Sequence, residues 1–520
     1  MVKTIDLRIP FNKIKDENYI ASLVKKEFND ENINHIEWRK KSLDARKKNI
    51  VYNLRVDVYI DEDYQEKTTF FNPKIINSSK TVTIIGAGPA GLFAALNCIE
   101  KGLKPIIYER GKDVRARRRD LAAIHKQMIV DEDSNYCFGE GGAGTFSDGK
   151  LYTRSKKRGN VKKVLEWLVH FGADKNILVE AHPHIGTNKL PKIIQNIRQA
   201  IINNGGEIHF QSKLTDFIVE KNQLKAIEIN HSEIKPIQHL ILATGHSARD
   251  IYYLLNDRGI KIEAKPFALG VRIEHQQHLI DKIQYHGLEN NEFLPPASYA
   301  LVTQVEETGV FSFCMCPGGI VAPCATNQNE VVTNGWSPSK RNNQFANSGI
   351  VAQIIPEKLP NYTKNNPFVA LDFQKEVEKK CWQAAGKTQQ VPAQRLMDFI
   401  NNKKSIDLPK SSYQPGIVSV NLNQVLPNFI TSKLKQAFLD FGKKMNGFLT
   451  NDAILHAPES RTSSPIKIPR DKITLEHIEI KNLYPSAEGA GYAGGIVSAA
   501  VDGMRIVDVI TEKQKRETSK

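Results

Sequence analysis

The stretch TVTIIGAGPAGLFAALNCIEKGLKPIIYE, residues 81–109, decides the fold of this 520-residue chain. It opens on β-branched and apolar residues, 82–85, a run that suits a parallel strand buried on both faces. A glycine-rich turn leads into an apolar helix over residues 92–101, and a second strand follows over residues 105–108. Strand, glycine-rich turn, helix, strand and a final acid, in that order, predict a βαβ unit that binds a dinucleotide.

Each glycine of this turn has a physical task. Gly86 allows the tight turn, Gly88 lets a diphosphate approach the backbone, and Gly91 lets the helix pack close to the strand. The start of the helix offers free N–H groups to the diphosphate. Glu109 lies 23 residues after Gly86, where a carboxylate can accept hydrogen bonds from a ribose 2′-hydroxyl. An acid there disfavours a 2′-phosphate, so the site fits FAD or NAD better than NADP.

Three later segments favour FAD over NAD, because FAD enzymes of the glutathione-reductase type close the cofactor site with distant parts of the chain. They are the glycine-rich loop of residues 136–150, the apolar strand of residues 240–245 that ends in Ala-Thr-Gly, and the glycine-rich turn of residues 487–495 before a long helix. The predicted cofactor-binding residues are Gly86, Ala87, Gly88, Pro89, Ala90, Gly91, Glu109, Arg110, Gly141, Gly142, Thr145, Ala243, Thr244, Gly245, Glu488, Gly489, Gly494 and Gly495.

The chain resembles the uncharacterised FAD-dependent dehydrogenase family, within the glutathione-reductase-like flavoproteins. Matching stretches include FGEGGAGTFSDGKL, LATGHSARD, FSFCMCPGG, ESRTSSPIKIPRD and EGAGYAGGIVSAAVDG. The resemblance implies bound FAD and a redox role, and it names no substrate. One departure is that many related flavoproteins carry Gly-Asp where this chain has Glu488-Gly489.

The predicted fold class is α/β: a glutathione-reductase-like FAD-binding Rossmann domain, with an inserted β-rich substrate domain and a small N-terminal α/β module of ferredoxin-like type. The predicted boundaries are 1–60 for the module, 61–80 for a linker, 81–264 and 451–510 for the two parts of the FAD domain, 265–450 for the β-rich and helical insert, and 511–520 for a frayed charged tail.

Composition sets broader limits. With 40% hydrophobic and 25% charged residues, the chain is an ordinary globular protein rather than a disordered or collagenous one. The net charge of +15 permits anionic partners but selects none, and because no nucleic-acid motif accompanies it, a solvated basic surface is favoured. Six cysteines are too sparse for a disulfide framework. We therefore expect a cytoplasmic protein without a membrane span or a cleaved leader.

The cysteines also bear on the chemistry. Cys98 and Cys137 each stand alone, so the redox pair of a flavin-linked disulfide reductase is missing near the first glycine-rich unit. Cys314 and Cys316, with Cys324 nearby, have no C-x₂-C or histidine partner to complete a zinc site. Thiols buried or near the flavin are favoured over a metal, and no metal is expected. Cys316 is one of two candidate catalytic residues.

Arg461 is the other candidate. It lies in a hydroxyl-rich turn, and its guanidinium is suited to bidentate contact with an anion, either the reduced flavin or a substrate carboxylate. The alternative is a salt bridge to Glu459 or to a distant acid.

The favoured function is an FAD-dependent oxidoreductase that holds FAD non-covalently and acts on a small molecule. No second GxGxxG is visible, so NAD(P)H would visit the flavin only transiently, and the donor need not be a nicotinamide. One alternative is a flavin-dependent RNA-modifying or RNA-binding protein, suggested by the net charge and the basic residues 40–48. Another is an FAD-binding scaffold or sensor.

Overall fold

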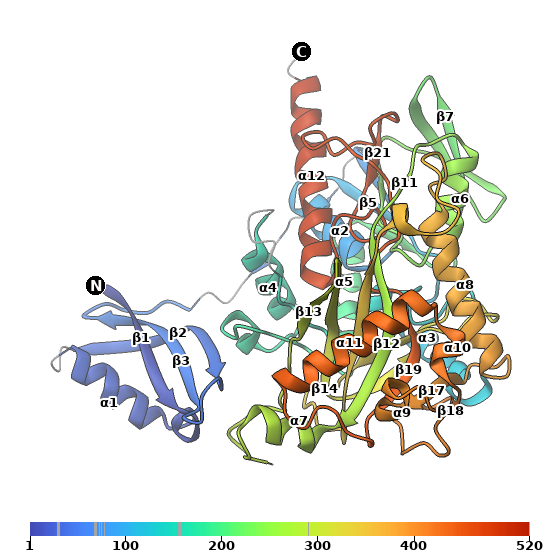
Figure 1. The fold of residues 1–520 in the computed structure, drawn as a ribbon. Helices are drawn as coiled ribbons and strands as arrows, with labels where there is room; N and C mark the ends of the chain where they lie inside the picture. Colours follow the sequence, from blue (N-terminus) through green and yellow to red (C-terminus); the bar gives the residue numbers. More distant parts are fainter. Residues whose placement is uncertain are drawn as a thin grey trace.

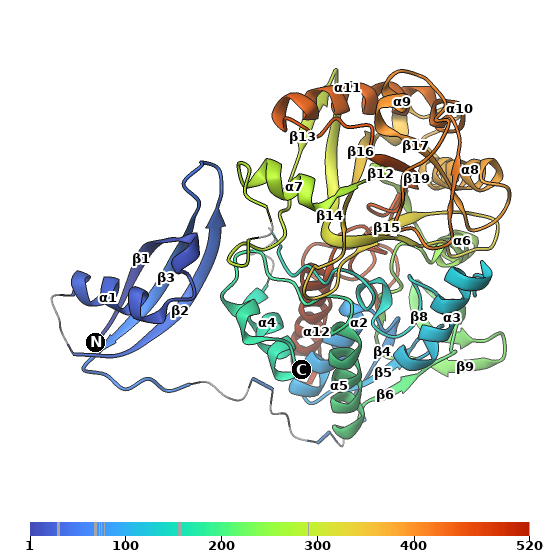
Figure 2. The same ribbon diagram turned by 90° about the horizontal axis from the view of Figure 1, so that it is seen from below.

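The computed structural model describes residues 1–28, 32–66, 70–71, 73, 75–76, 79–153, 159–289 and 291–518. A small N-terminal module lies beside a larger body, in which a parallel and an antiparallel sheet lie one above the other (Figure 2). None of the described helices is long and apolar enough to cross a membrane.

The N-terminal module consists of one helix packed on a three-stranded antiparallel sheet of order β1-β3-β2. Its elements are β1 (Val2–Pro10), α1 (Glu17–Glu27), β2 (Ile33–Asp44) and β3 (Val51–Ile60). The Asp16 side chain caps α1 by accepting from the Tyr19 N–H, and Ile20 and Val24 of α1 pack on the sheet. A complete ferredoxin-like module needs a second helix and a fourth strand, so the described part of residues 1–60 does not confirm that prediction.

Several contacts join this module to the body: Ile50 is buried in a hydrophobic core of the body, and Lys41 forms a β-bridge with Glu180. The Tyr52 hydroxyl donates to the Phe293 carbonyl (3.0 Å), and Lys41 pairs with Glu180 (2.9 Å). The predicted linker, residues 61–80, lies partly outside the described residues.

The parallel sheet has the order β21-β10-β4-β5-β6, and it contains the strand, turn, helix and strand predicted from residues 81–109. Its strands are β4 (Thr81–Ile85), β5 (Lys104–Tyr108), β6 (Glu207–His209), β10 (Leu240–Leu242) and β21 (Leu483–Pro485). Successive side chains point to opposite faces, as in any strand. Ile84 packs into a core with the helices of one face, and Ile85 into a second core on the other.

Four helices, α2 (Pro89–Glu100), α4 (Val161–His170), α5 (Leu190–Asn203) and α12 (Ile496–Thr518), contribute to the first core. Helix α12 lies close along α2: a Cβ added at Gly503 would be 2.2 Å from the Ala90 carbonyl oxygen. Because α12 continues to Thr518, most of the predicted frayed tail is helical. The second core contains residues of α6 (Arg249–Asp257), β7 (Leu214–Glu220) and β8 (Gln223–Ile229), and β9 (Glu233–Pro236) pairs with β8 at the edge of that small sheet. Helix α3 (Val114–Gln127) follows β5.

The larger sheet is mainly antiparallel, with the order β13-β14-β16-β12-β19-β17-β18, and β15 pairs with β14. Its strands are β12 (Phe267–Gln276), β13 (Val302–Val305), β14 (Thr308–Pro323), β15 (Thr333–Trp336), β16 (Phe345–Ile354), β17 (Val391–Arg395), β18 (Ile417–Ser419) and β19 (Ile454–Glu459). Its helices are α7 (Gln277–Gln284), α8 (Val369–Ala384), α9 (Leu396–Ile400), α10 (Leu422–Val425) and α11 (Asn428–Lys444), and α11 lies across the sheet (Figure 1).

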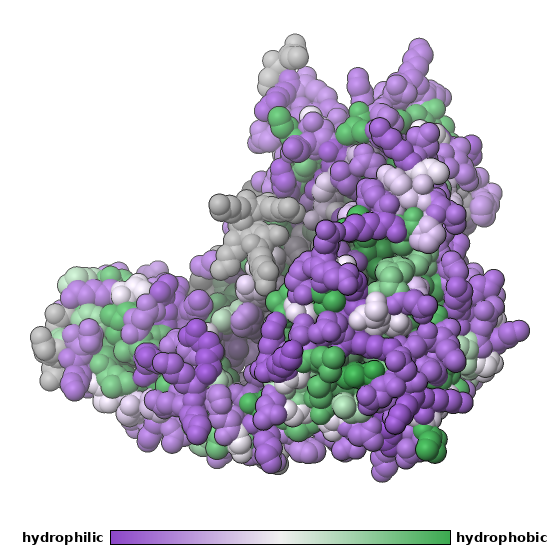
Figure 3. All heavy atoms as spheres, viewed as in Figure 1, coloured by the Kyte–Doolittle hydropathy of each residue, from purple (hydrophilic) through white to green (hydrophobic). Residues whose placement is uncertain are grey.

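One boundary differs from the prediction. Strand β19 pairs with β12 and β17, so the antiparallel sheet takes up residues that we assigned to the FAD domain. The chain returns to the parallel sheet only afterwards, through a short ribbon of β11 (Glu263–Ala264) and β20 (Ile466–Lys467). On the face in Figure 3, hydrophilic residues predominate and apolar atoms appear in patches between them.

Candidate functional site

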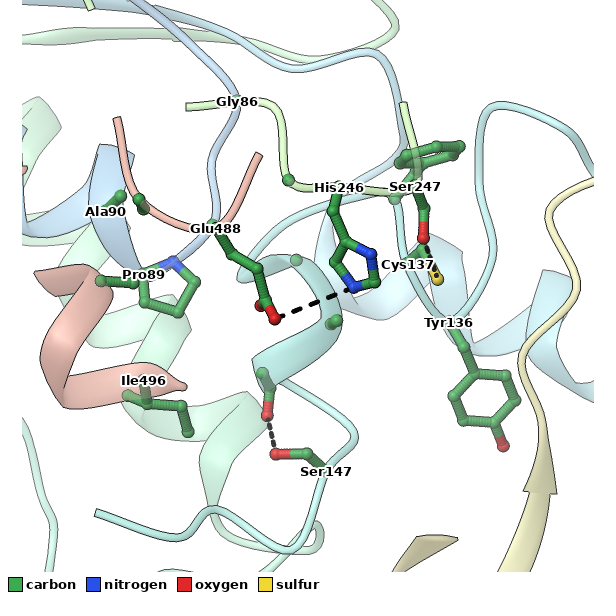
Figure 4. A pocket seen from close by; sticks show the side chains of 18 of the residues that line it. Gly86, Pro89, Ala90, Tyr136, Cys137, Ser147, His246, Ser247, Glu488 and Ile496 are labelled. Atoms are coloured by element: carbon green, nitrogen blue, oxygen red, sulfur yellow. Dashed lines mark hydrogen bonds and ion pairs between the residues drawn. The ribbon is translucent and has the colours of Figure 1, made fainter. Parts of the chain in front are cut away.

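A cavity that opens to solvent lies where the carboxyl ends of the parallel strands face the antiparallel sheet, and its empty space, the solvent at its mouth included, is about 1670 Å³. In open α/β sheets this edge is where ligands bind. The cavity is lined by the turn after β4, the end of β5, the loop of residues 136–150, the segment after β10, parts of β14 and β15, Arg461 and the start of α12. Figure 4 shows several of these segments converging on the space.

The glycine-rich turn forms the floor of the cavity. Gly86 has φ +103°, and a Cβ there would lie 2.5 Å from the Ala243 carbonyl oxygen. A Cβ at Gly91 would lie 2.0 Å from the Gly86 carbonyl oxygen, so both glycines are required by the packing of the chain itself. A Cβ at Gly88 would meet only the Cα of Gly142, at 4.0 Å. Gly88 therefore faces open space at the start of α2, the position where a diphosphate needs room and free N–H groups.

Glu109 ties three segments together at the end of β5. The carboxylate is 5% exposed; one oxygen accepts from the Ala87 N–H (2.8 Å), and the other from the Gly111 and Gly139 N–H groups (both 2.9 Å). A carboxylate has about four acceptor positions, so these three bonds leave one. Glu109 also lines the cavity.

Twelve of the eighteen predicted cofactor residues line this cavity: Gly86, Gly88, Pro89, Ala90, Glu109, Arg110, Gly142, Ala243, Thr244, Gly245, Glu488 and Gly495. The other six, Ala87, Gly91, Gly141, Thr145, Gly489 and Gly494, are not among the lining residues. Some of these six support the wall from behind. The Thr145 hydroxyl donates to the Glu140 carbonyl, and a Cβ at Gly489 would lie 2.7 Å from the Gly245 carbonyl oxygen.

Glu488 and His246 face one another across the cavity (Figure 4), with His246 Nε2 4.0 Å from Glu488 Oε1. Burial raises the pKa of Glu488 to about 7, and burial lowers the pKa of His246 to about 3. The imidazole is therefore neutral, and of the two groups it is the Glu488 carboxyl that can take up or release a proton near neutral pH. Sequence reasoning missed His246, although it directly follows the predicted Ala-Thr-Gly.

Arg461 also lines the cavity, but its N–H groups donate to other residues of the protein rather than into the cavity. Every N–H of its guanidinium is engaged, by Ser247 (3.2 Å), Thr326 (2.8 Å), Glu330 (2.5 Å) and Glu378 (3.2 Å from both Nε and Nη2). This geometry leaves no donor for an anion and matches the alternative of a salt bridge to distant acids.

Arg461 belongs to a buried cluster of two arginines and two glutamates. Arg249 donates to Glu330 (2.9 Å) and to Glu378 (2.7 Å), the same two carboxylates that Arg461 contacts. The charges balance within the cluster. Glu459, the nearer acid considered from the sequence, pairs instead with Arg272 at 2.8 Å.

A third arginine organises the loop around Cys137. Arg117 is fully buried and donates to the carbonyls of Asn135, Tyr136 and Glu140. These bonds fix the course of the chain that forms one wall of the cavity.

Four of the six cysteines lie at or directly behind the cavity. Cys137, Cys314 and Cys324 line it, whereas the candidate Cys316 is fully buried beside Cys314. Cys98 and Cys381 lie inside hydrophobic cores. In the described part of the chain, no three His, Cys, Asp or Glu side chains are grouped so that they could hold a metal ion.

Comparison with known proteins bears on this site. Residues 266–462 match the family described as "FAD-dependent protein, C-terminal domain-like", and residues 1–59 match a domain of unknown function, DUF8436. A protein of Clostridium beijerinckii described as uncharacterized is 38% identical over 520 residues, which is 96% of each chain. The chain belongs to the same family as this clostridial protein. The family description and the room at Gly88 together support FAD as the cofactor.

Among solved structures, the chain is similar to a geranylgeranyl bacteriochlorophyll reductase-like protein from Thermoplasma acidophilum, at 14% identity and TM-score 0.36, covering 84% of this chain and 80% of that one. It is also similar to CtdE in complex with FAD, at 10% identity and TM-score 0.31, covering 84% of each chain.

Proposed function

We propose that this chain is an FAD-dependent oxidoreductase whose small-molecule substrate meets the flavin between the two sheets. The observation that supports it best is the continuity of one cavity, which joins Gly88 and Glu109 on the parallel-sheet side to Cys314 and Trp336 on the antiparallel-sheet side. A glutathione-reductase-like arrangement is part of the proposal, because the last strand of the parallel sheet and the start of α12 return to the cavity from the C-terminal part of the chain.

Named residues would hold each part of the cofactor. Gly88 and the start of α2 would take the diphosphate, and Glu109 the adenosine ribose. The segment of Glu488 and Gly495, at the start of α12, would take the flavin end. FAD, when bound, supplies the hydride or electron transfer. The protein supplies binding, orientation and exclusion of water.

Glu488 would handle the proton, with His246 as a positioning residue beside it. A carboxyl that titrates near pH 7 can donate or accept a proton, whereas an imidazole with a pKa of about 3 stays neutral. Lys265 lies close enough to Glu488 to oppose the rise in its pKa. Glu488 would thus take up or release the proton as the substrate reacts, and the neutral imidazole of His246, 4.0 Å away, would orient the groups around it.

The electron donor would be a separate molecule that binds only transiently. The described residues form a single parallel sheet with one glycine-rich turn of this kind, so NAD(P)H would reach the flavin transiently from the substrate side. A donor that is not a nicotinamide would use the same route.

RNA binding lacks a supporting observation. The basic residues 40–48 lie partly in β2, where Lys41 pairs with Glu180, and Arg46 pairs with Asp44. The cysteines are all free thiols, in keeping with the proposed cytoplasmic location.

A cofactor and reduction assay tests the proposal. The purified protein is expected to release FAD on denaturation, and its flavin absorbance is expected to bleach anaerobically with NADH, NADPH or a substrate from a screen. Release of FMN, or protein that takes up no flavin, would contradict FAD binding. Bound FAD that no donor reduces would favour the scaffold or sensor.

A variant pair tests the proton step. His246→Asn is expected to keep FAD but to slow reduction by the donor found in the screen. His231→Asn, at an exposed histidine that does not line the cavity, is the matched control and should behave as the wild type. Equal reduction rates for both variants over the pH range would remove His246 from the mechanism.

A further inference from the structure

The segment FSFCMCPGG of β14 contains a β-bulge at its cysteines. Phe313 lies opposite Gly349 of β16 and Cys316 lies opposite Asn347, so two residues of β14 face one residue of β16. Cys314, the first of the two, has φ +47°. That left-handed conformation is unusual for a residue with a Cβ, and bulges of this kind often re-aim a side chain next to an active site.

The bulge separates the environments of the two thiols. Cys314 is partly exposed and lines the cavity, whereas Cys316 is fully buried just behind it. The Cys316 sulfur also lies 3.2 Å from the Cys314 carbonyl oxygen. An accessible thiol backed by a buried one is the arrangement in which an attacking thiolate and a resolving thiol operate.

The ammonium group of one lysine contacts the sulfurs of both cysteines. Lys150, from the glycine-rich loop of the parallel-sheet side, places its Nζ 3.7 Å from Cys314 Sγ and 3.7 Å from Cys316 Sγ. Asp148, 3.4 Å from the same Nζ, and Arg341, 2.9 Å from Asp148, fix the ammonium there. Both sulfurs on the antiparallel-sheet side therefore contact an ammonium group that comes from the parallel-sheet side.

The charges around Cys314 favour its thiolate. A hydrogen bond from the Cys316 thiol, together with the positive charges of Lys150 and Arg272, lowers the pKa of Cys314 well below its ordinary value, against burial and Asp148. The pKa of Cys316 is raised because Cys314 takes the negative charge. The negative charge of Cys314 also helps to raise the pKa of Glu488, on the cofactor side of the cavity.

We propose that Cys314 and Cys316 form a redox-active dithiol that exchanges electrons with the flavin, and that a small disulfide is the class of substrate that Cys314 meets. This inference rests on the proposed FAD-dependent function. Cys314 is the cavity-facing partner and Cys316 is the resolving thiol.

The exchange balances without a further reagent. The Cys314 thiolate and the Cys316 thiol form one S–S bond as the S–H bond of Cys316 breaks, and they release two electrons and one proton. Bound FAD would supply the acceptor for these two electrons and the proton, and in the other direction the donor that restores the dithiol. The dithiol of Cys314 and Cys316 would then reduce a substrate disulfide to two thiols by thiol–disulfide exchange and itself become the disulfide.

A second pair of thiols at the cavity provides the control. Cys137 receives a hydrogen bond from Ser247 (3.4 Å) and lies 3.8 Å from the Cys324 carbonyl oxygen. Arg117 and Arg461 lie near Cys137, but the guanidinium of each donates to carbonyls, hydroxyls or carboxylates of the chain, and none of the described lysines contacts these two sulfurs. We therefore expect the redox chemistry at Cys314 and Cys316 and not at Cys137.

The first test counts thiols on the holoprotein. Wild-type protein treated with the thiol oxidant diamide, then denatured and alkylated, is expected to carry two labels fewer by intact mass than protein reduced beforehand. Cys314→Ser and Cys316→Ser should lose this difference, and Cys137→Ser should keep it. Equal label numbers for oxidised and reduced wild type would overturn the proposal, as would a difference that persists in Cys314→Ser.

The second test counts electrons. FAD content is measured first, so that a failure to bind FAD, which sinks the proposed function, is distinguished from a failure of the dithiol. In anaerobic dithionite titrations, oxidised wild type should take up about twice the reducing equivalents per flavin that Cys314→Ser takes up, because the disulfide adds a second two-electron couple. Equal uptake by flavin-loaded wild type and variant would show that the thiols do not exchange with the flavin.

The third test addresses Lys150 as a positioning residue. Lys150→Gln should shift the pH dependence of Cys314 alkylation to higher pH, since the loss of the ammonium destabilises the thiolate. Lys150→Arg retains the positive charge and should restore most of the shift. Identical pH profiles for wild type and Lys150→Gln would assign Lys150 to structure alone.

Discussion

The two sheets form opposite walls of one cavity by different physical means. On the parallel-sheet side, the main chain shapes the wall: Gly88 leaves space, and Glu109 accepts hydrogen bonds from three main-chain N–H groups. On the antiparallel-sheet side, pairs of buried charged side chains hold the wall together, as in the Arg272–Glu459 pair, where both side chains are at most 2% exposed. A backbone site tolerates many side chains around it, whereas a network of buried charges fails when one member is lost.

The largest expected effect tests the antiparallel side. Arg272→Met leaves the Glu459 carboxylate buried without its partner, so we expect the free energy of unfolding to fall by about 3–5 kcal/mol. Urea unfolding measures it. The double variant Arg272→Met/Glu459→Leu is the matched control and should recover most of the loss. A single variant as stable as wild type would show that this wall does not depend on its charges.

A pH series tests the same wall. Burial raises the pKa of Glu274 to about 7, above its ordinary value, so the folded state holds this proton more tightly than the unfolded state. Its contribution to stability is complete below the unfolded pKa and is lost as pH rises through about 7. Glu274→Gln cannot ionise, so its stability relative to wild type should increase by at most about 3 kcal/mol across this range. A difference that does not change with pH would contradict this.

The parallel side is tested at Gly88. Gly88→Val should abolish FAD binding, because the side chain enters the space left for the diphosphate. The added stability that FAD gives the wild type, about 2.7 kcal/mol at about 100 times its Kd, would disappear. Without FAD, thermal unfolding should match the wild type, since the Cβ meets open space. Gly91→Ala is the contrast and should destabilise the protein even without FAD.

Glu109 offers a smaller effect on the same side. Glu109→Ala should weaken FAD binding by roughly 1–3 kcal/mol, the cost of leaving hydrogen-bonding groups unpaired. Fluorescence titration of the apoprotein with FAD measures it. Glu207→Ala, at the more exposed acid of the neighbouring strand β6, should leave the affinity unchanged. Equal affinities for both variants would mean that Glu109 only ends its strand.

The smallest effect is expected far from both walls. Arg55 pairs with Asp6 at 2.9 Å on the N-terminal module, with both side chains more than half exposed. Exposed pairs contribute little, so Arg55→Ala should leave the unfolding midpoint of the protein unchanged. A loss comparable to that of Arg272→Met would remove the distinction between buried and exposed charges.

The difference between the walls also explains what the sequence predicts. The tasks of Gly86, Gly88 and Gly91 follow from spacing within one turn, and the structure places these residues in the predicted strand, turn and helix. Glu109 likewise follows from its position at the end of a strand. A local pattern carries this information because the backbone that forms the site is itself local.

The charge networks have no such local signal. Arg461 meets Glu330 from 131 residues away, and Arg272 meets Glu459 from 187 residues away. No spacing rule connects such positions. The sequence therefore left two roles open for Arg461, anion binding and a salt bridge within the protein, and could not decide between them. The sequence likewise gives no signal for the bulge at Cys314, because regular strand alternation predicts that Cys314 and Cys316 share one face.

The return of the chain to the parallel sheet has a consequence for how the protein acquires its cofactor. A ribosome adds about 5–20 residues per second, so the turn at Gly88 emerges well before Ala487 and Ile496, which close the same cavity. Until the start of α12 has been made, the nascent chain lacks one wall of its binding site. The site that we propose for FAD is therefore complete only when the chain has been made as far as the start of α12.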